Sequence, residues 1–292
     1  AELIPTEASV SHPFLITAQA TGTPVIQGED ATLLCQGAAP PLIAGDFNGW
    51  DTRSSPAWER LAAGLWAYTL TLPRDAYMEY AVCTGEAEED RITDPLNPRS
   101  TPNGMGHTNS YFYMPEGVPT LLTRRARGVP KGKVTRHIIR NRWLLANGRR
   151  TVYLYQPPVS EPCPLVVVYD GFEYYHRDHL PTIVDNLISQ GRIQPIALAM
   201  ADHGGPARGI EYGCSEATVG FVMEHVLPLA EEHLNIIPAQ AAAGSYGVIG
   251  ASAGGRMALF TALRVPGIIG RVLSQAGAFK FDEYESVLFD LV

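Results

Sequence analysis

The chain has 292 residues, 46% hydrophobic and 18% charged, a composition typical of a globular protein and a length that suits two domains. Its four scattered cysteines argue against a disulfide framework or a zinc cluster, and no apolar stretch is long enough to span a membrane. The net charge of −8 is uneven: residues 1–118 hold 5 Lys and Arg against 15 Asp and Glu, and residues 119–292 hold 17 against 15. This acidic first part argues against nucleic acid as a partner, and the change in charge predicts a domain boundary near residue 118.

Short apolar or alternating segments, separated by Gly, Pro and Asp, follow one another through residues 14–113. We expect strands at residues 31–36, 41–44, 65–72 and 78–83. Cys35 and Cys83 could face each other across such a fold and form a disulfide, but we expect two reduced thiols. Reduced cysteines favour a location in the cytoplasm. The pattern predicts an all-β, immunoglobulin-like sandwich over residues 1–118.

The segment Ala44-Gly45-Asp46-Phe47-Asn48-Gly49-Trp50-Asp51 resembles the Gly-Asp-Phe-Asn-x-Trp signature of early-set immunoglobulin-like domains, carbohydrate-binding family 48. The resemblance covers about 80 residues. In those domains a tryptophan can stack on sugar, which makes Trp50, Trp58 and Trp66 candidate platforms. The alternative, which we favour, is that these tryptophans belong to the core of the sandwich.

Strands and helices alternate in residues 119–292. Asn147-Gly148 predicts a hairpin between residues 134–139 and 150–156. We then expect strands at 165–169, 196–200, 247–250 and 269–273, and helices at 183–190, 217–233 (with a kink at Pro228) and after residue 252. This order is typical of an α/β-hydrolase domain with three layers, α/β/α.

Gly250-Ala251-Ser252-Ala253-Gly254 lies between an apolar strand and a helical pattern, which is the context of a nucleophile elbow. We expect Ser252 to be a catalytic nucleophile; the alternative is a glycine-rich turn with a buried serine. The backbone N–H of Ala253 is the expected first oxyanion donor, and that of Gly171 or Phe172, after the strand at 165–169, the second.

A catalytic triad is incomplete in this sequence. In the α/β-hydrolase order the acid and the histidine follow the serine, but all eight histidines precede Ser252. We therefore expect the acid and the histidine beyond Val292 and an incomplete domain at the C-terminus, with His203 as a fallback base. The strand at 269–273 would then be an apolar edge, covered in a dimer or by a bound C-terminal fragment.

Asp94-Pro95-Leu96-Asn97-Pro98, Gly104-Met105-Gly106-His107-Thr108-Asn109-Ser110 and a closing Met114-Pro115 resemble the interdomain passage of bacterial enterochelin (enterobactin) esterases. Tyr169-Asp170-Gly171 and Arg208-Gly209-Ile210-Glu211-Tyr212 resemble the esterase D group, to which those enzymes belong. The resemblance implies a serine esterase that cleaves a catecholate siderophore trilactone, free or ferric, with no cofactor and with iron only in the substrate. His107 becomes a candidate substrate contact. Arg208 and Glu211 either contact substrate or pair with each other as a brace.

Two other functions stay open. One is a carbohydrate esterase, feruloyl or acetyl-xylan, because a module like family 48 also precedes esterase D domains in those enzymes. The other is a non-catalytic binding protein whose hydrolase domain has lost its base. The connector at residues 94–98 and 104–110 favours the siderophore enzyme.

Overall fold

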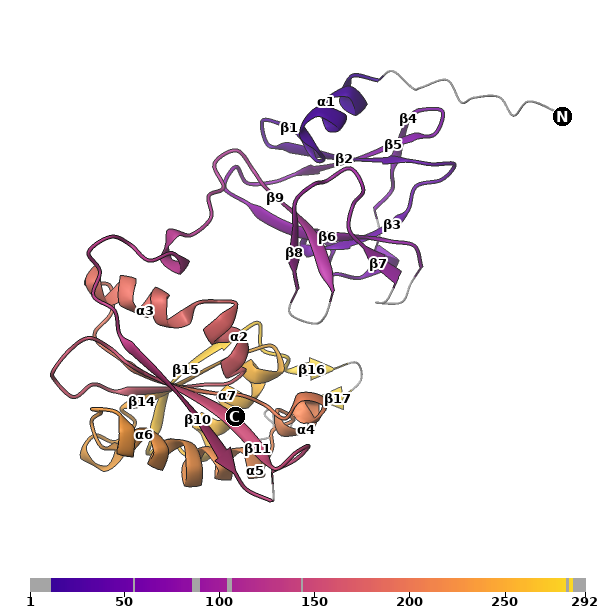
Figure 1. Ribbon diagram of the computed structural model, residues 1–292. Helices are drawn as coiled ribbons and strands as arrows, with labels where there is room; N and C mark the ends of the chain where they lie inside the picture. Colours follow the sequence, from indigo (N-terminus) through magenta and orange to yellow (C-terminus); the bar gives the residue numbers. More distant parts are fainter. Residues whose placement is uncertain are drawn as a thin grey trace. The chain divides into compact units, whose positions relative to one another are not determined.

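The computed structural model describes residues 12–54, 56–85, 90–103, 107–142, 144–281 and 284–285. The chain divides into two compact units, residues 1–119 and 120–292, so the division lies one residue from the predicted boundary (Figure 1). None of the described helices is long and apolar enough to cross a membrane. All four cysteines are free thiols, as expected for Cys35 and Cys83.

Two antiparallel sheets form the N-terminal unit. One has the strand order β1-β2-β5-β4, and the other the order β3-β6-β9-β8, with β7 paired to β6. Leu33 and Leu70 from the first sheet pack in one buried cluster with Ile43, Tyr80 and Phe112 from the second. The two sheets therefore enclose a common core. The strands are β1 (Val25–Gln27), β2 (Asp30–Gln36), β3 (Leu42–Gly45), β4 (Glu59–Ala62), β5 (Leu65–Thr71), β6 (Tyr77–Cys83), β7 (Arg91–Ile92), β8 (Ser100–Pro102) and β9 (Thr108–Tyr113).

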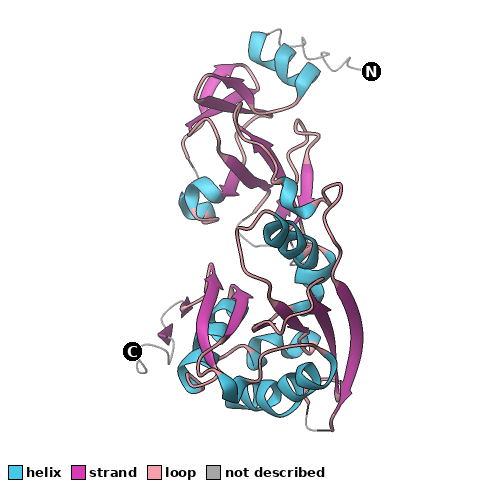
Figure 2. Cartoon of the chain, turned by 90° about the vertical axis from the view of Figure 1, so that its left-hand side faces the viewer, coloured by secondary structure: helices cyan, strands magenta, loops and turns pink. Residues whose placement is uncertain are grey.

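The unit is not all-β as predicted, because helix α1 (Pro13–Thr21) precedes its first strand (Figure 2). The helix begins with proline at its first position, and the side chain of His12 accepts a hydrogen bond from the N–H of Phe14 at 3.3 Å. Leu15 and Ala18 are buried, and Ala18 packs in a cluster with residues of the first sheet. Nine residues are too few for the apolar spacing to stand out in the sequence.

The tryptophans are only partly in the core, so that expectation was wrong for two of the three. Trp58 packs against the cluster between the sheets. The half-buried rings of Trp50 and Trp66 instead donate hydrogen bonds, to the carboxylate of Asp46 at 3.0 Å and to the carbonyl of Gly37 at 3.1 Å. An indole N–H near the surface finds a polar partner, and this holds the ring away from the core.

A six-stranded mixed sheet forms the centre of the C-terminal unit, with the order β10-β11-β13-β12-β14-β15. The first three strands are antiparallel neighbours, and β13, β12, β14 and β15 are parallel. Their bounds are β10 (Lys133–Arg140), β11 (Arg149–Gln156), β12 (Leu165–Val168), β13 (Ala197–Ala201), β14 (Tyr246–Ala251) and β15 (Ile269–Gln275). Beyond β15, the short strands β16 (Lys280–Phe281) and β17 (Tyr284–Glu285) pair with each other.

Helices cover both faces of this sheet, which gives three layers (Figure 1). On one face, β11, β12 and β14 contribute apolar side chains to a cluster with α5 (Glu216–Phe221), α6 (Leu227–His233) and α7 (Ala253–Arg264). On the other face, Tyr174 of α2 (Gly171–His176) and Val184 of α3 (Leu180–Ser189) pack against Leu198 and Met200 of β13. A single turn, α4 (Arg208–Glu211), lies between β13 and α5.

The helix predicted over residues 217–233 is interrupted just before its proline. A π-helical turn at Val222–Val226 separates α5 from α6, and Pro228 occupies the first turn of α6. A proline has no N–H to donate and its ring crowds the carbonyl four residues earlier, so the preceding turn widens.

The common direction of the parallel strands determines where the candidate site lies. Because β13, β12 and β14 run in the same direction, their carboxyl ends meet at one edge of the sheet. The loops after β12 and β13 and the turn into α7 therefore converge there.

Candidate active site

Ser252 occupies the sharp turn between β14 and α7. Its φ and ψ are 54° and −121°, a conformation that a residue with a side chain rarely adopts, and the residue is exposed. A Cβ atom on Gly250 would lie 2.2 Å from the carbonyl oxygen of Gly254, so only glycine fits where strand and helix approach each other. This is the geometry of a nucleophile elbow and excludes the alternative of a buried serine.

Two hydrogen bonds, one to the last residue of β15 and one to the segment that follows it, fix this turn. The N–H of Ser252 donates to the carbonyl of Gln275 at 2.8 Å, and the N–H of Ala278 donates to the carbonyl of Ser252 at 3.0 Å. The N–H of Arg256 also donates to that carbonyl, at 3.1 Å, as the first bond of α7. Both backbone groups of Ser252 are thus occupied, and its strained conformation is held from two sides.

The expected oxyanion donors belong to the first turns of two neighbouring helices. Ala253 is the first residue of α7, and Gly171 and Phe172 are the first two of α2. A Cβ atom on Gly171 would lie 2.4 Å from the backbone of Met200, so glycine lets this loop lie directly on β13. First-turn N–H groups have no partner inside their own helix and favour negative charge. The structure brings these residues to one edge of the sheet, and their role in stabilising an oxyanion stays a prediction.

Asp170, which separates β12 from α2, forms a two-pronged ion pair with Arg208. The guanidinium donates to the two carboxylate oxygens at 2.7 and 2.8 Å, and it lies 5.2 Å from the ring centroid of Tyr212. The carboxylate raises the pKa of Arg208, and burial, followed by the charge of Asp170, raises the pKa of Tyr212 well above its usual value. Asp170 was not among the residues predicted for the site. Its position directly before Gly171 was the available signal.

One ring nitrogen of His203, the fallback base, accepts a hydrogen bond, and the other faces Asp170. Its Nδ1 accepts a hydrogen bond from the N–H of Gly205 at 2.9 Å, and its Nε2 lies 3.7 Å from a carboxylate oxygen of Asp170. A neutral ring that accepts at Nδ1 carries its proton on Nε2, so it offers no free lone pair to a serine hydroxyl. This arrangement argues against His203 as the base.

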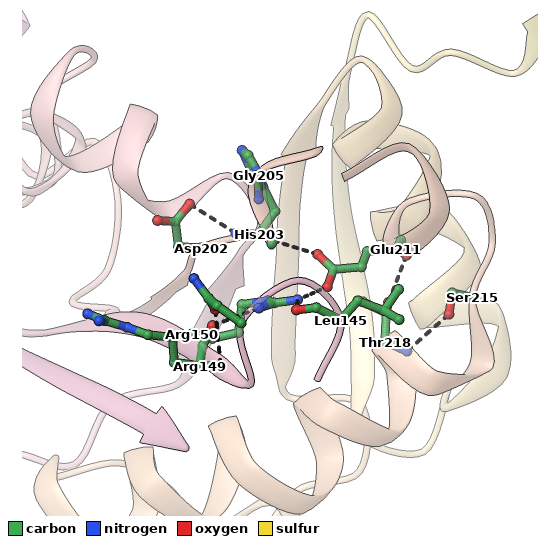
Figure 3. A network of polar contacts seen from close by, with 11 residues as sticks. Leu145, Arg149, Arg150, Asp202, His203, Gly205, Glu211, Ser215 and Thr218 are labelled. Carbon is green, nitrogen blue, oxygen red and sulfur yellow. Dashed lines mark hydrogen bonds and ion pairs between the residues drawn. The ribbon is translucent and has the colours of Figure 1, made fainter. Parts of the chain in front are cut away.

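Glu211 pairs with Arg150 of β11 (Figure 3). Arg208 pairs with Asp170, so a brace between Arg208 and Glu211 was the wrong prediction. The Arg150 side chain is only 2% exposed and also donates to the carbonyls of Leu145 and Arg149. The second oxygen of Glu211 accepts from the N–H of Gly204 at 2.8 Å. Three residues apart on one turn, Arg208 and Glu211 could have paired, but each has a more buried partner of opposite charge.

Around this pair, the loop after β13 is held in place (Figure 3). Asp202 accepts from the N–H of His203 at 2.9 Å, and burial raises the pKa of its carboxyl group. Thr218 of α5 donates its hydroxyl to the carbonyl of Glu211 at 2.7 Å. The segment that carries His203 and Arg208 is therefore tied both to β11 and to α5.

His107 belongs to the N-terminal unit, where its backbone exchanges hydrogen bonds with Asn103 directly before β9. This matches a histidine in a local turn, and its contact with substrate stays a prediction. Substrate contact by Arg208 and Glu211 stays a prediction as well, although both oxygens of Glu211 are already bonded inside the protein.

Comparisons with known proteins agree with this geometry. Residues 145–282 match the family model Esterase, described as "Putative esterase". The iron(III) enterobactin esterases of Escherichia coli O6:H1 (strain CFT073) and of strain K12 are 29% and 27% identical over 192 and 191 residues. Each match covers 64% of this chain and 46% of the relative, so the chain spans about half the length of these curated relatives.

Two solved structures share the fold. The enterobactin esterase of Shigella flexneri, in the presence of 2,3-di-hydroxy-N-benzoyl-serine, matches with a TM-score of 0.66 and 21% identity over 91% of this chain and 76% of its own. The ferric enterobactin esterase of Salmonella typhimurium matches with a TM-score of 0.66 and 19% identity over 86% and 72%. The chain is therefore similar to the enterobactin esterases in sequence and in fold, and its residues 145–282 match the Esterase family model.

Proposed function

We propose that the protein is a serine esterase that hydrolyses the ester bonds of a catecholate siderophore trilactone, free or iron-loaded. The observation that carries the proposal is the exposed, strained Ser252 at the turn into α7. The relatives named as iron(III) enterobactin esterases support the choice of substrate. In this proposal iron enters only as part of the substrate, and no cofactor takes part.

The chemistry follows from the elbow. The hydroxyl oxygen of Ser252 attacks the ester carbonyl, its proton passes to a base, and the N–H groups of Ala253 and of Gly171 or Phe172 stabilise the oxyanion. The released alcohol takes up a proton, and water then hydrolyses the acyl-enzyme to give the free acid. Helix α7 points its N-terminus at the reacting centre, which favours the developing negative charge. We assign the base to none of the eight histidines of this sequence.

The finer fold assignment belongs to the same proposal. We assign the C-terminal unit to the α/β-hydrolase fold, supported by its strand order and its elbow, and the N-terminal unit to the early-set immunoglobulin-like sandwiches. Location in the cytoplasm, and a dimer or a bound C-terminal fragment at β15, stay predictions.

A serine-directed probe tests the nucleophile. We expect a fluorophosphonate to label Ser252, as mapped by peptide mass spectrometry, and Ser252→Ala to abolish both labelling and hydrolysis, with a loss of about 10⁴-fold or more in kcat. Ser160→Ala, a change of the same kind in an exposed loop, is the matched control and should retain full activity. Labelling of another residue, or unchanged turnover by Ser252→Ala, would contradict the assignment.

The substrate is tested on the same preparation. We expect a higher kcat/KM for the catecholate trilactone than for a feruloylated arabinoside or acetylated xylan. The reverse order would move the assignment to a carbohydrate esterase. No hydrolysis of any of the three esters would favour a binding protein.

A further inference from the structure

A buried carboxylate lies beside the expected oxyanion donors. Asp170 is 6% exposed and precedes Gly171 directly, so it adjoins one donor segment in the chain. Its Oδ2 atom lies only 2.8 Å from the place where a Cβ atom on Gly254 would stand, and Gly254 follows Ala253, the other donor. The carboxylate is therefore next to both segments whose N–H groups are expected to meet an oxyanion.

An uncompensated negative charge at this place would oppose catalysis. Oxyanion stabilisation depends on a positive potential in a site that excludes water, and a nearby like charge removes part of it. Arg208 compensates the charge, because its guanidinium meets both oxygens of Asp170 at 2.7 and 2.8 Å. The guanidinium also lies over the buried ring of Tyr212, 5.2 Å from its centroid, a favourable cation–π contact.

The backbone of the loop does not depend on this ion pair. The N–H of Asp170 donates to the hydroxyl of Tyr212 at 3.0 Å, and its carbonyl accepts from Tyr174 at 3.2 Å. Tyr212 is held in turn by Arg256, whose Nε donates to its carbonyl at 3.2 Å. Removal of the Arg208 side chain would thus leave the loop attached and expose the charge of Asp170.

We propose, on the basis of the proposed function, that Arg208 is a positioning residue that neutralises Asp170 and so keeps the oxyanion site electropositive. It acts through Asp170 and does not contact the substrate. Its contribution belongs to the transition state, where the oxyanion forms, and it therefore appears in kcat and not in KM.

The test compares Arg208→Met, Asp170→Asn and the double variant in the protein at its natural length, with trilactone as substrate. We expect Arg208→Met to lower kcat about 10- to 100-fold, with KM unchanged within about threefold. The double variant, which has lost both charges, should recover kcat to within about fivefold of the parent. Arg177→Met removes a half-exposed arginine at the end of α2 and is the matched control, with unchanged kcat and KM.

Other results would overturn the inference. Equal losses in both single variants and the double variant would mean a mechanical brace, and a rise of KM whenever Arg208 is absent would mean a substrate contact.

If Arg208→Met does not fold, as judged by circular dichroism, Asp170→Asn and the double variant should still have equal kcat, and a difference would refute the proposal. A parent enzyme that is active and labelled at Ser252, but whose kcat does not respond to Arg208→Met, defeats this inference alone. A parent enzyme without a reactive Ser252 defeats the proposed function and this inference together.

Discussion

The buried ion pair between Arg150 and Glu211 predicts a large loss of stability for Arg150→Met. The two side chains are 2% and 12% exposed, so little solvent screens either charge. After the substitution, Glu211 keeps only the N–H of Gly204 as a partner, and the carbonyl of Leu145 loses its donor. The result is an unpaired charge in the interior.

Removal of one partner of a buried pair costs about 3–5 kcal/mol of unfolding free energy. For a unit of this size, that corresponds to a fall in melting temperature of about 6–20 °C. Arg150→Met with Glu211→Leu removes both charges. The carbonyls of Leu145 and Arg149 lose the same donor as in Arg150→Met alone, and the further loss is the acceptor of the Gly204 N–H, a cost of about 1–3 kcal/mol. The double variant should therefore be more stable than Arg150→Met alone.

Thermal unfolding followed by circular dichroism measures these differences. The matched control is Arg264→Met, which breaks an ion pair with Glu216 whose side chains are 45% and 60% exposed, and which should cost at most about 1 kcal/mol. If Arg150→Met is no more destabilising than Arg264→Met, or if the double variant is less stable than Arg150→Met, the argument from burial is refuted.

Two further predictions concern the same edge of the sheet. Asp202→Asn should raise the melting temperature at pH 7, because burial raises the pKa of this carboxyl group in the folded state, so the parent loses stability as pH rises through that pKa. The gain should shrink as the pH falls well below 3.8, where the carboxyl group is protonated in both states, and an equal gain at all pH values would contradict this reasoning. Gly250→Ala should prevent formation of the elbow, since its methyl group would meet the backbone of Gly254 at 2.2 Å. A soluble Gly250→Ala protein with parental labelling of Ser252 would disprove it.

The elbow could be predicted from sequence because its causes are local. Five residues, Gly250 to Gly254, carry the tight approach, the exposed serine and the first turn of the helix, and the flanking apolar pattern fixes what lies on either side. The alternation of strands and helices was predictable for the same reason. The kink predicted at Pro228 is found as a π-helical turn at Val222–Val226, directly before α6.

The charged network was not predictable, because its partners lie far apart in the chain. Arg208 and Asp170 are 38 residues apart, and Arg150 and Glu211 are 61 apart. No local sequence feature indicates that Arg208 pairs with Asp170, in the loop after β12, and not with Glu211 on its own turn. Which of two acids an arginine meets is decided by the fold, through burial and distance.

The positive-φ conformation of Ser252 is held by residues that follow it in the chain. Its amide and its carbonyl are bonded to Gln275 and Ala278, at and just beyond the end of β15, which is the outermost strand of this sheet within the described residues. Edge strands separate from a sheet more readily than central ones, because they are hydrogen-bonded to a neighbouring strand on one side only. A brief detachment of β15 would let Ser252 relax from its positive φ while the core around β12 and β13 stays folded. The strained conformation that we propose for a nucleophile at Ser252 therefore depends on the local stability of β15, which can fall before the domain unfolds.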